Sequence, residues 1–187
     1  MRYHPLNPNI IAVAVGTSLY AVQLNSPSSP PRAISTTHNS RITTLDWSDN
    51  GNFLVTASDD QVCVWDSNNA NRWRTLKAQQ TQKVNSCAFI KASSLSTSST
   101  AMATGSLKAN ATTTRLVYGE YEKIWIWTFT GGGYIGSTPV ADSRAHPGAT
   151  VSALASSLVQ LGETPTVMLA SASASRDGNL KLWKLPV

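Results

Sequence analysis

Three histidines and a group of aspartates are the residues of this 187-residue chain that could do acid–base or metal chemistry. The histidines are His4, His38 and His146. The aspartates gather in one stretch, as Asp46, Asp49, Asp59, Asp60 and Asp66. Imidazole and carboxylate groups move protons or bind metal ions when a fold brings them together. The chain contains no Gly-x-Ser-x-Gly, His-Glu-x-x-His, Cys-x-x-Cys or phosphate-loop motif to organise them.

The spacing of the aspartates argues against a joint catalytic or metal site. They fall in and between short segments that alternate apolar and polar residues, and such segments are expected to be strands separated by turns. The carboxylates would then be spread over several turns. We therefore predict that the chain is not an enzyme and has no catalytic residues, metal ion or cofactor.

The elements that would position these residues recur along the chain. Three copies open with apolar residues at i, i+3 and i+5, except that Ser156 takes the last place in the final copy. Each of the three continues with a strand that ends in small residues and closes with an alternating strand that ends on tryptophan. The closing residues are Trp65, Trp127 and Trp183, and a shorter copy at residues 10–22 has Val22 in this place. Short strands in a repeated order predict an all-β chain of antiparallel sheets.

Two copies carry polar landmarks in the same order. These are His38, Asp60 and Trp65 in one copy, and His146, Asp177 and Trp183 in the last. In these residues the chain resembles the WD-repeat family, in which a Gly-His-like pair opens each repeat and Trp-Asp closes it. Trp65-Asp66 matches the closing pair, whereas Trp127-Thr128 and Trp183-Lys184 depart from it. The resemblance implies a WD-repeat β-propeller, here a partial ring of about three and a half blades.

The resemblance also implies a hydrogen-bonded network of Trp, a Ser or Thr, His and a turn Asp inside each blade. A buried indole N–H needs such an acceptor. In the first complete repeat the members would be Trp65, His38, Thr56 or Ser58, and Asp60 or Asp59. In the last repeat they would be Trp183, His146 and Asp177, with Ser171, Ser173 and Ser175 as alternatives for the hydroxyl.

The third repeat departs from this pattern. Gln79 or Gln80 stands at the His position, and Tyr121 or Glu122 at the Asp position. We expect its network to be incomplete and its stability to depend more on the packing of Trp125 and Trp127.

We predict one partial propeller over residues 1–187. Its parts are half a blade at 1–24, a blade at 32–66, a blade at 72–129 with a Ser/Thr-rich insertion at 91–114, and a blade at 145–185. Rings commonly contain more blades than this, and open propeller ends expose strand edges and apolar faces. We therefore expect further blades, from the same or another chain, to complete the ring.

The bulk composition limits the class of partner. The formal net charge is +5, but Lys and Arg occur without any run of three, which favours a mildly basic surface over a nucleic-acid-binding face. Cys63 and Cys87 lie in apolar strand-like runs, as buried thiols of a reducing compartment would. Because no run near 20 apolar residues is present, we expect no membrane association and a soluble, intracellular protein.

A closer resemblance is to the C-terminal WD repeats of LEUNIG-type (Groucho/Tup-like) transcriptional corepressors. It rests on four features: the one-residue-short turn in residues 58–65, the third-repeat segments 83–89 and 118–124, the opening Ala145-His146-Pro147-Gly148, and the end of the chain soon after Trp183. It implies a nuclear scaffold that binds peptide segments of transcription factors or adaptor proteins. Alternatives are a scaffold of a cytoplasmic mRNA-decay or a nuclear-pore assembly, or a nucleic-acid-binding propeller, whose affinity would fall steeply with salt.

One face of such a propeller would carry the loops before the first strand and after the second strand of each repeat. Peptide recognition by exposed loops favours Arg and Tyr as major contacts. The candidate partner contacts are Asn39, Arg41, Lys83, Tyr121 and Arg176, with Ser40, Gln82, Glu122 and Pro147 beside them.

Overall fold

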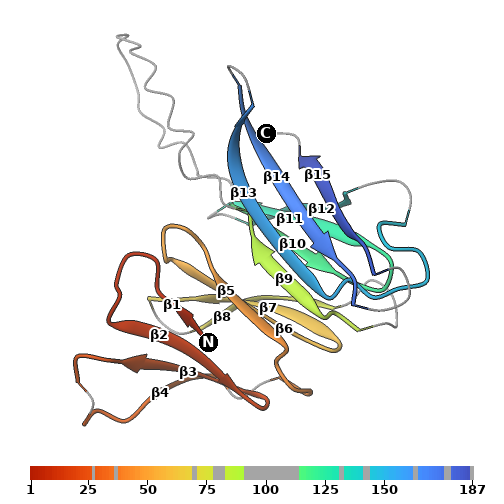
Figure 1. Cartoon of the computed structure of the whole chain (residues 1–187). Helices are drawn as coiled ribbons and strands as arrows, with labels where there is room; N and C mark the ends of the chain where they lie inside the picture. The colour runs from red at the N-terminus through yellow and green to blue at the C-terminus, as the bar shows by residue number, and fades with distance from the viewer. Residues whose placement is uncertain are drawn as a thin grey trace, which may run out of the picture.

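The computed structural model of the chain contains four antiparallel sheets. It describes residues 1–26, 28–35, 38–68, 71–77, 83–90, 114–130, 133–140, 144–161, 164–174 and 178–185. Within these residues all regular elements are strands, and the sheets follow one another in chain order (Figure 1). The predicted all-β propeller architecture is confirmed.

We call the sheets blades 1 to 4. Blade 1 contains β1 (Arg2–Tyr3), β2 (Ile10–Val15), β3 (Ser18–Gln23) and β4 (Arg32–Ser35). Blade 2 contains β5 (Thr44–Trp47), β6 (Phe53–Ser58), β7 (Gln61–Asp66) and β8 (Arg72–Lys77). Blade 3 contains β9 (Ser86–Phe89), β10 (Thr114–Gly119), β11 (Ile124–Thr130) and β12 (Gly133–Pro139). Blade 4 contains β13 (Ala153–Leu161), β14 (Thr164–Ala172) and β15 (Leu180–Leu185).

The blade boundaries differ from those predicted. Arg32–Ser35 pairs with β3 through Leu19↔Ser35 and Ala21↔Arg32, so it completes blade 1, which is a four-stranded sheet and not half a blade over 1–24. In the same way Arg72–Lys77 pairs with β7 and belongs to blade 2. Each outer strand thus belongs to the sheet before it, because that sheet offers the unpaired backbone edge. Residues 91–113 of the predicted insertion lie outside the described residues.

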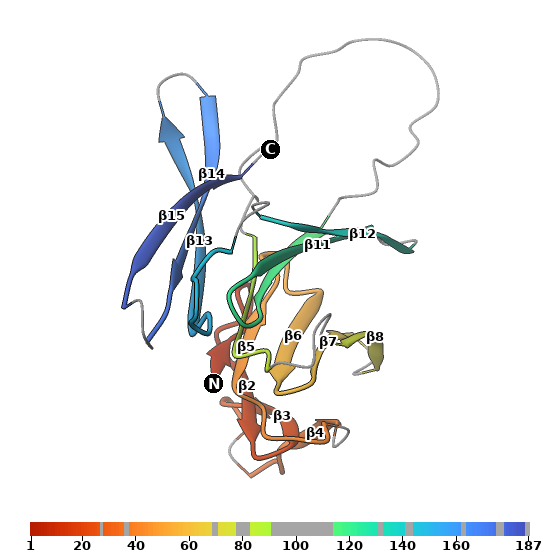
Figure 2. The same ribbon diagram turned by 90° about the vertical axis from the view of Figure 1, so that its right-hand side faces the viewer.

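The first strands of the blades lie side by side. Contacts join β1 to β5, β5 to β9, and β9 to β13, and Figure 2 shows the sheets from a second direction. Polar bonds also join these strands: the Phe89 amide donates to Asp46 Oδ2 (3.0 Å), and the Ser156 hydroxyl donates to the Phe89 carbonyl (2.9 Å). The inner strands therefore form one continuous wall.

The hydrophobic core consists of three clusters, one at each junction between blades. Ala12 and Leu19 of blade 1 meet Leu45 and Trp65 of blade 2. The other two clusters join blade 2 to blade 3 and blade 3 to blade 4. Strands between two blades are therefore buried on both faces, as in β7, whereas β13 alternates exposed and part-buried residues because only one of its faces is covered.

Candidate partner-binding site

A buried polar network stabilises the loop that connects blade 1 to blade 2. The Trp65 indole donates to Thr56 Oγ1 at 2.8 Å, and Thr56 Oγ1 lies 2.8 Å from His38 Nε2. On the other side of the ring, His38 Nδ1 lies 2.9 Å from Ser58 Oγ, which donates to Asp60 Oδ1 at 3.2 Å. Thr56 and Ser58 are both members, and the carboxylate of this network comes from Asp60 and not from Asp59.

The two ends of the network determine the direction of every proton in it. An indole N–H can only donate and a carboxylate can only accept. Because Ser58 donates to Asp60, it must accept from His38 Nδ1–H, which leaves Nε2 as the acceptor of the Thr56 hydroxyl. We therefore assign His38 as a neutral imidazole protonated on Nδ1. Because the side-chain amide of Gln61 lies 3.4 Å from the same Nδ1, this tautomer requires the amide oxygen, not its nitrogen, to face the ring.

The environment of His38 favours the same protonation state. Burial lowers the pKa of the imidazole below its usual value of 6.5; the Asp60 carboxylate opposes this shift, and Arg72 adds to it. Neutral His38 is then the form on which the network depends.

Acidification is expected to destabilise the fold through His38. Between the lowered pKa and pH 6.5 the unfolded chain binds a proton at His38 that the folded chain does not bind. The contribution of His38 to the free energy of unfolding is therefore complete above pH 6.5 and is lost as the pH falls through the lowered pKa. One proton gives a slope of at most about 1.4 kcal/mol per pH unit. Urea unfolding between about pH 7.5 and about pH 5.5 should show a smaller slope in His38→Gln. An identical slope in both proteins would contradict the assignment.

Blade 4 repeats part of this arrangement. The Trp183 indole donates to Ser171 Oγ at 2.8 Å, and His146 Nε2 lies 2.9 Å from the same hydroxyl. Ser171 is therefore the hydroxyl that the sequence left open among three serines. Asp177, its proposed carboxylate, and Ser175 lie outside the described residues.

The strand register explains where the network can form. The acceptor lies two residues beyond the cross-strand partner of the tryptophan: Leu54 pairs with Trp65, and Leu169 pairs with Trp183. In blade 3 the partner of Trp127 is Leu116, so this position is Tyr118, which is completely buried in the cluster with Phe89 and Phe129. In blades 2 and 4 a small hydroxyl residue at this position leaves room for a histidine ring. In blade 3 the ring of Tyr118 fills that room. Gln79 and Gln80 lie outside the described residues.

Loops of successive blades meet on the face that carries the β2–β3, β6–β7 and β10–β11 turns. The Ile42 amide donates to the Gly16 carbonyl (2.8 Å), and the Val84 amide donates to the Asp59 carbonyl (3.0 Å). At the third junction, Tyr121 forms a β-bridge with Thr150. We call the surface formed by these turns and the incoming loops the loop face.

Glu122 connects two blades on the loop face. Its Oε1 accepts from the Gly148 amide at 2.6 Å, and its Oε2 pairs with Arg144 Nε at 2.9 Å. Its backbone amide donates to the Ala149 carbonyl, and its φ of 61° is unusual for a residue with a side chain. The sequence suggested Glu122 only as an alternative to a turn aspartate, and no local pattern indicated this contact between blades.

The predicted partner contacts occupy different environments on the loop face. Asn39 and Arg41 are exposed, and Tyr121 is half-buried beside Thr150. Lys83 is exposed but pairs with Asp59 at 3.0 Å. Arg176 lies outside the described residues. Among the described residues no carboxylate pairs with Arg41.

A groove of about 560 Å³ runs along the inner strands. Residues of β1, β5, β9 and β13 line it, including Arg2 and Asp46, and Asp49 joins them from the loop after β5. No three His, Cys, Asp or Glu side chains in the described part of the chain lie where they could hold a metal ion. The same residues include no helix long and apolar enough to cross a membrane.

Comparison with known proteins agrees with the architecture. Residues 30–66 match the family model WD40, described as WD domain, G-beta repeat. No curated protein sequence matches the chain. Two similar solved structures are described as "Structure of U3-55K" (TM-score 0.61, 16% identity) and "Crystal structure of RRP9 WD40 repeats" (TM-score 0.63, 16% identity).

Each comparison with a solved structure covers 99% of this chain but only 48% and 47%, respectively, of the other chain. The chain thus spans about half the length of the structures it matches. At this identity, and with 489 matching chains in all, the likeness shows the fold and does not single out an activity. The matched repeat at residues 30–66 and the four consecutive sheets show that the chain has the fold of a partial β-propeller and contains one stretch similar to a WD40 repeat.

Proposed function

We propose that the chain is a macromolecular adaptor whose loop face binds peptide segments of partner proteins. The observation that carries this proposal is the set of connected loops: each junction between blades is held by backbone bonds, while Asn39 and Arg41 remain exposed. Rigid loops that carry exposed polar side chains lose little conformational entropy when a partner binds.

Comparison of two junctions suggests the chemistry of the partner. Arg41 and Lys83 occupy equivalent positions, because each precedes the residue whose amide bonds to the neighbouring turn. Lys83 lies beside Asp59 and pairs with its carboxylate. Arg41 instead lies beside Gly16, which has no side chain, and the space that a Cβ at Gly16 would point into is open. Arg41 is therefore available for a carboxylate on the partner, and an arginine can hold a carboxylate through two hydrogen bonds.

Replacing Arg41 with alanine is expected to weaken partner binding about tenfold, equivalent to about 1.4 kcal/mol, and to leave the unfolding midpoint unchanged. Affinity capture with mass spectrometry identifies the partners, and titration of a captured protein then compares wild type, Arg41→Ala and Lys83→Ala. Lys83→Ala is the matched control because its charge is already neutralised by Asp59. Equal losses in both variants would contradict a specific role of Arg41, and unfolding of Arg41→Ala would contradict its surface assignment.

We further propose, from the LEUNIG-type sequence features, that the adaptor acts as a corepressor-type scaffold in the nucleus and binds transcription factors or adaptor proteins. Co-purification with transcriptional regulators from a nuclear fraction would support this assignment. Cytoplasmic recovery with mRNA-decay proteins, or recovery with nuclear-pore proteins, would replace it by one of the other scaffold functions.

A further inference from the structure

Both end blades carry a face on which no other blade of the described chain packs. Each inner junction shows how such a face is normally buried: Val55 and Ala57 of β6, and Val62 and Val64 of β7, are at most 1% exposed beneath blade 3. We call this side of a blade, which meets the following blade, its forward face.

The forward face of blade 4 has the same pattern without a cover. By register, the positions of Val55, Ala57, Val62 and Val64 are taken by Ala170, Ala172, Leu180 and Leu182. Leu180 is 69% exposed and Leu182 is 66% exposed. The neighbouring strand adds the exposed Val159 to the same face. Apolar side chains at these positions are suited to burial against another sheet.

The opposite, backward face of blade 1 is equally apolar. Its residues include Tyr3, Val15 and Ser18 together with the part-buried Val13, Tyr20 and Val22 and the buried Ile11. Val13, Val15 and Val22 stand at the positions that Thr56, Ser58 and Trp65 occupy in blade 2, so aliphatic side chains replace the polar network here. Tyr3 is 60% exposed and Val15 is 62% exposed.

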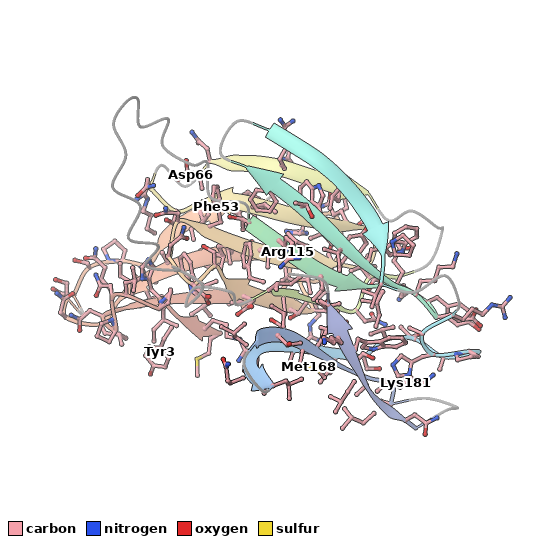
Figure 3. The ribbon with its side chains drawn as sticks, turned by 90° about the horizontal axis from the view of Figure 1, so that it is seen from above. Tyr3, Phe53, Asp66, Arg115, Met168 and Lys181 are labelled. Carbon is pink, nitrogen blue, oxygen red and sulfur yellow. The ribbon has the colours of Figure 1, made fainter. Side chains whose placement is uncertain are left out.

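The chain therefore exposes one forward and one backward face, which are the two kinds of surface that meet at each inner junction. In Figure 3, Tyr3 of blade 1 and Met168 of blade 4 lie at the same side of the molecule, away from Phe53 and Arg115. The charge on the forward face comes from Lys184, and no acidic or basic residue lies among the residues named for the backward face. Two such faces can be buried against each other with little charge desolvation.

We propose that two copies of this chain close one ring, with the forward face of each copy packed on the backward face of the other. The two copies together supply eight sheets, within the range of about four to eight found in propellers. The half-length match to the solved structures fits this count. Closure also encloses the groove lined by the inner strands, whose wall is otherwise incomplete. In a dimer with twofold symmetry both open faces of each copy are buried, and no open face remains to which a further copy could bind.

Light scattering coupled to gel filtration tests the assembly of the 187-residue chain. The expected mass is twice the 20.0 kDa of one chain. Leu182→Glu should shift the mass to that of one chain, because a carboxylate would then be buried in the interface, and circular dichroism checks that its strands are retained. Asn39→Glu adds the same charge on the exposed loop face and should leave the dimer intact. A wild-type monomer, an open series of larger oligomers, or a Leu182→Glu dimer would each overturn the proposal.

Thiol cross-linking tests which faces meet. Leu180 and Val15 lie beside the turns that join the second and third strands of their blades. A short bismaleimide should link Leu180→Cys chains to Val15→Cys chains after the two are mixed and exchanged, and should not link Leu180→Cys chains to one another. Native Cys63 and Cys87 are buried, and burial raises the pKa of both thiols, so wild type is the unreactive control. Links within Leu180→Cys alone would show forward faces paired together and would overturn the proposal.

Discussion

Replacing Trp65 with alanine is expected to lower the free energy of unfolding by roughly 3–5 kcal/mol. The side chain is 2% exposed and packs in the cluster between blades 1 and 2 with Leu45 and Leu54. Its removal empties a large volume in that cluster and also leaves Thr56 without the indole donor. Urea unfolding followed by circular dichroism measures the loss.

Two further variants separate the packing of Trp65 from its hydrogen bond. Trp65→Phe keeps an aromatic ring in the cluster but removes the N–H, so it should cost about 1–3 kcal/mol. Trp183→Ala in blade 4 should cost less than Trp65→Ala, because Trp183 is half-buried. Equal losses at Trp65 and Trp183 would show that burial between two blades is not what makes Trp65 important.

Replacing Gly119 with alanine is expected to destabilise the protein by about 1–3 kcal/mol. Gly119 ends β10 at the junction between blades 3 and 4. A Cβ there would lie 2.6 Å from Val151 Cβ and 2.7 Å from Ser86 Oγ. Val151 is completely buried, so it cannot move aside without disturbing the inner strands.

The sign of the Gly119→Ala effect is the test. Replacing a strand glycine that has space around it with alanine usually stabilises a protein by about 0.4–1 kcal/mol, because the unfolded chain loses conformational freedom. Chemical denaturation should instead show a loss, and a larger loss for Gly119→Val. A gain in stability would show that blades 3 and 4 can separate at this point. Ala57 occupies the equivalent place in blade 2, where its side chain is completely buried.

The blade boundaries show where prediction from sequence reaches its limit. The order of strands could be predicted because alternation and turn residues are local properties. Residues 32–35 and 72–77 could not be assigned to a sheet in this way, because a strand that follows one blade and precedes the next can pair with either. The unpaired edges of β3 and β7 decide the choice.

The same distinction holds at the candidate site. His38, Asp60 and Trp65 could be named from the resemblance to the WD-repeat family, since residues of one repeat fold together. The choice of Ser171 over its neighbours depended on the register between β14 and β15, which places only that hydroxyl near both Trp183 and His146. The link from Glu122 to Gly148 also joins residues that are distant in sequence.

The sequence by itself determined that this chain is an all-β series of repeats, because alternation and spacing are properties of one repeat, and the resemblance to the WD-repeat family implied the polar network at His38 and Trp65. The tertiary structure decided to which sheet each outer strand belongs, which serine accepts the hydrogen bond of the Trp183 indole, and on which two apolar faces no other blade packs. Those features depend on backbone edges and on packing between blades, where residues far apart in the chain compete for the same partner.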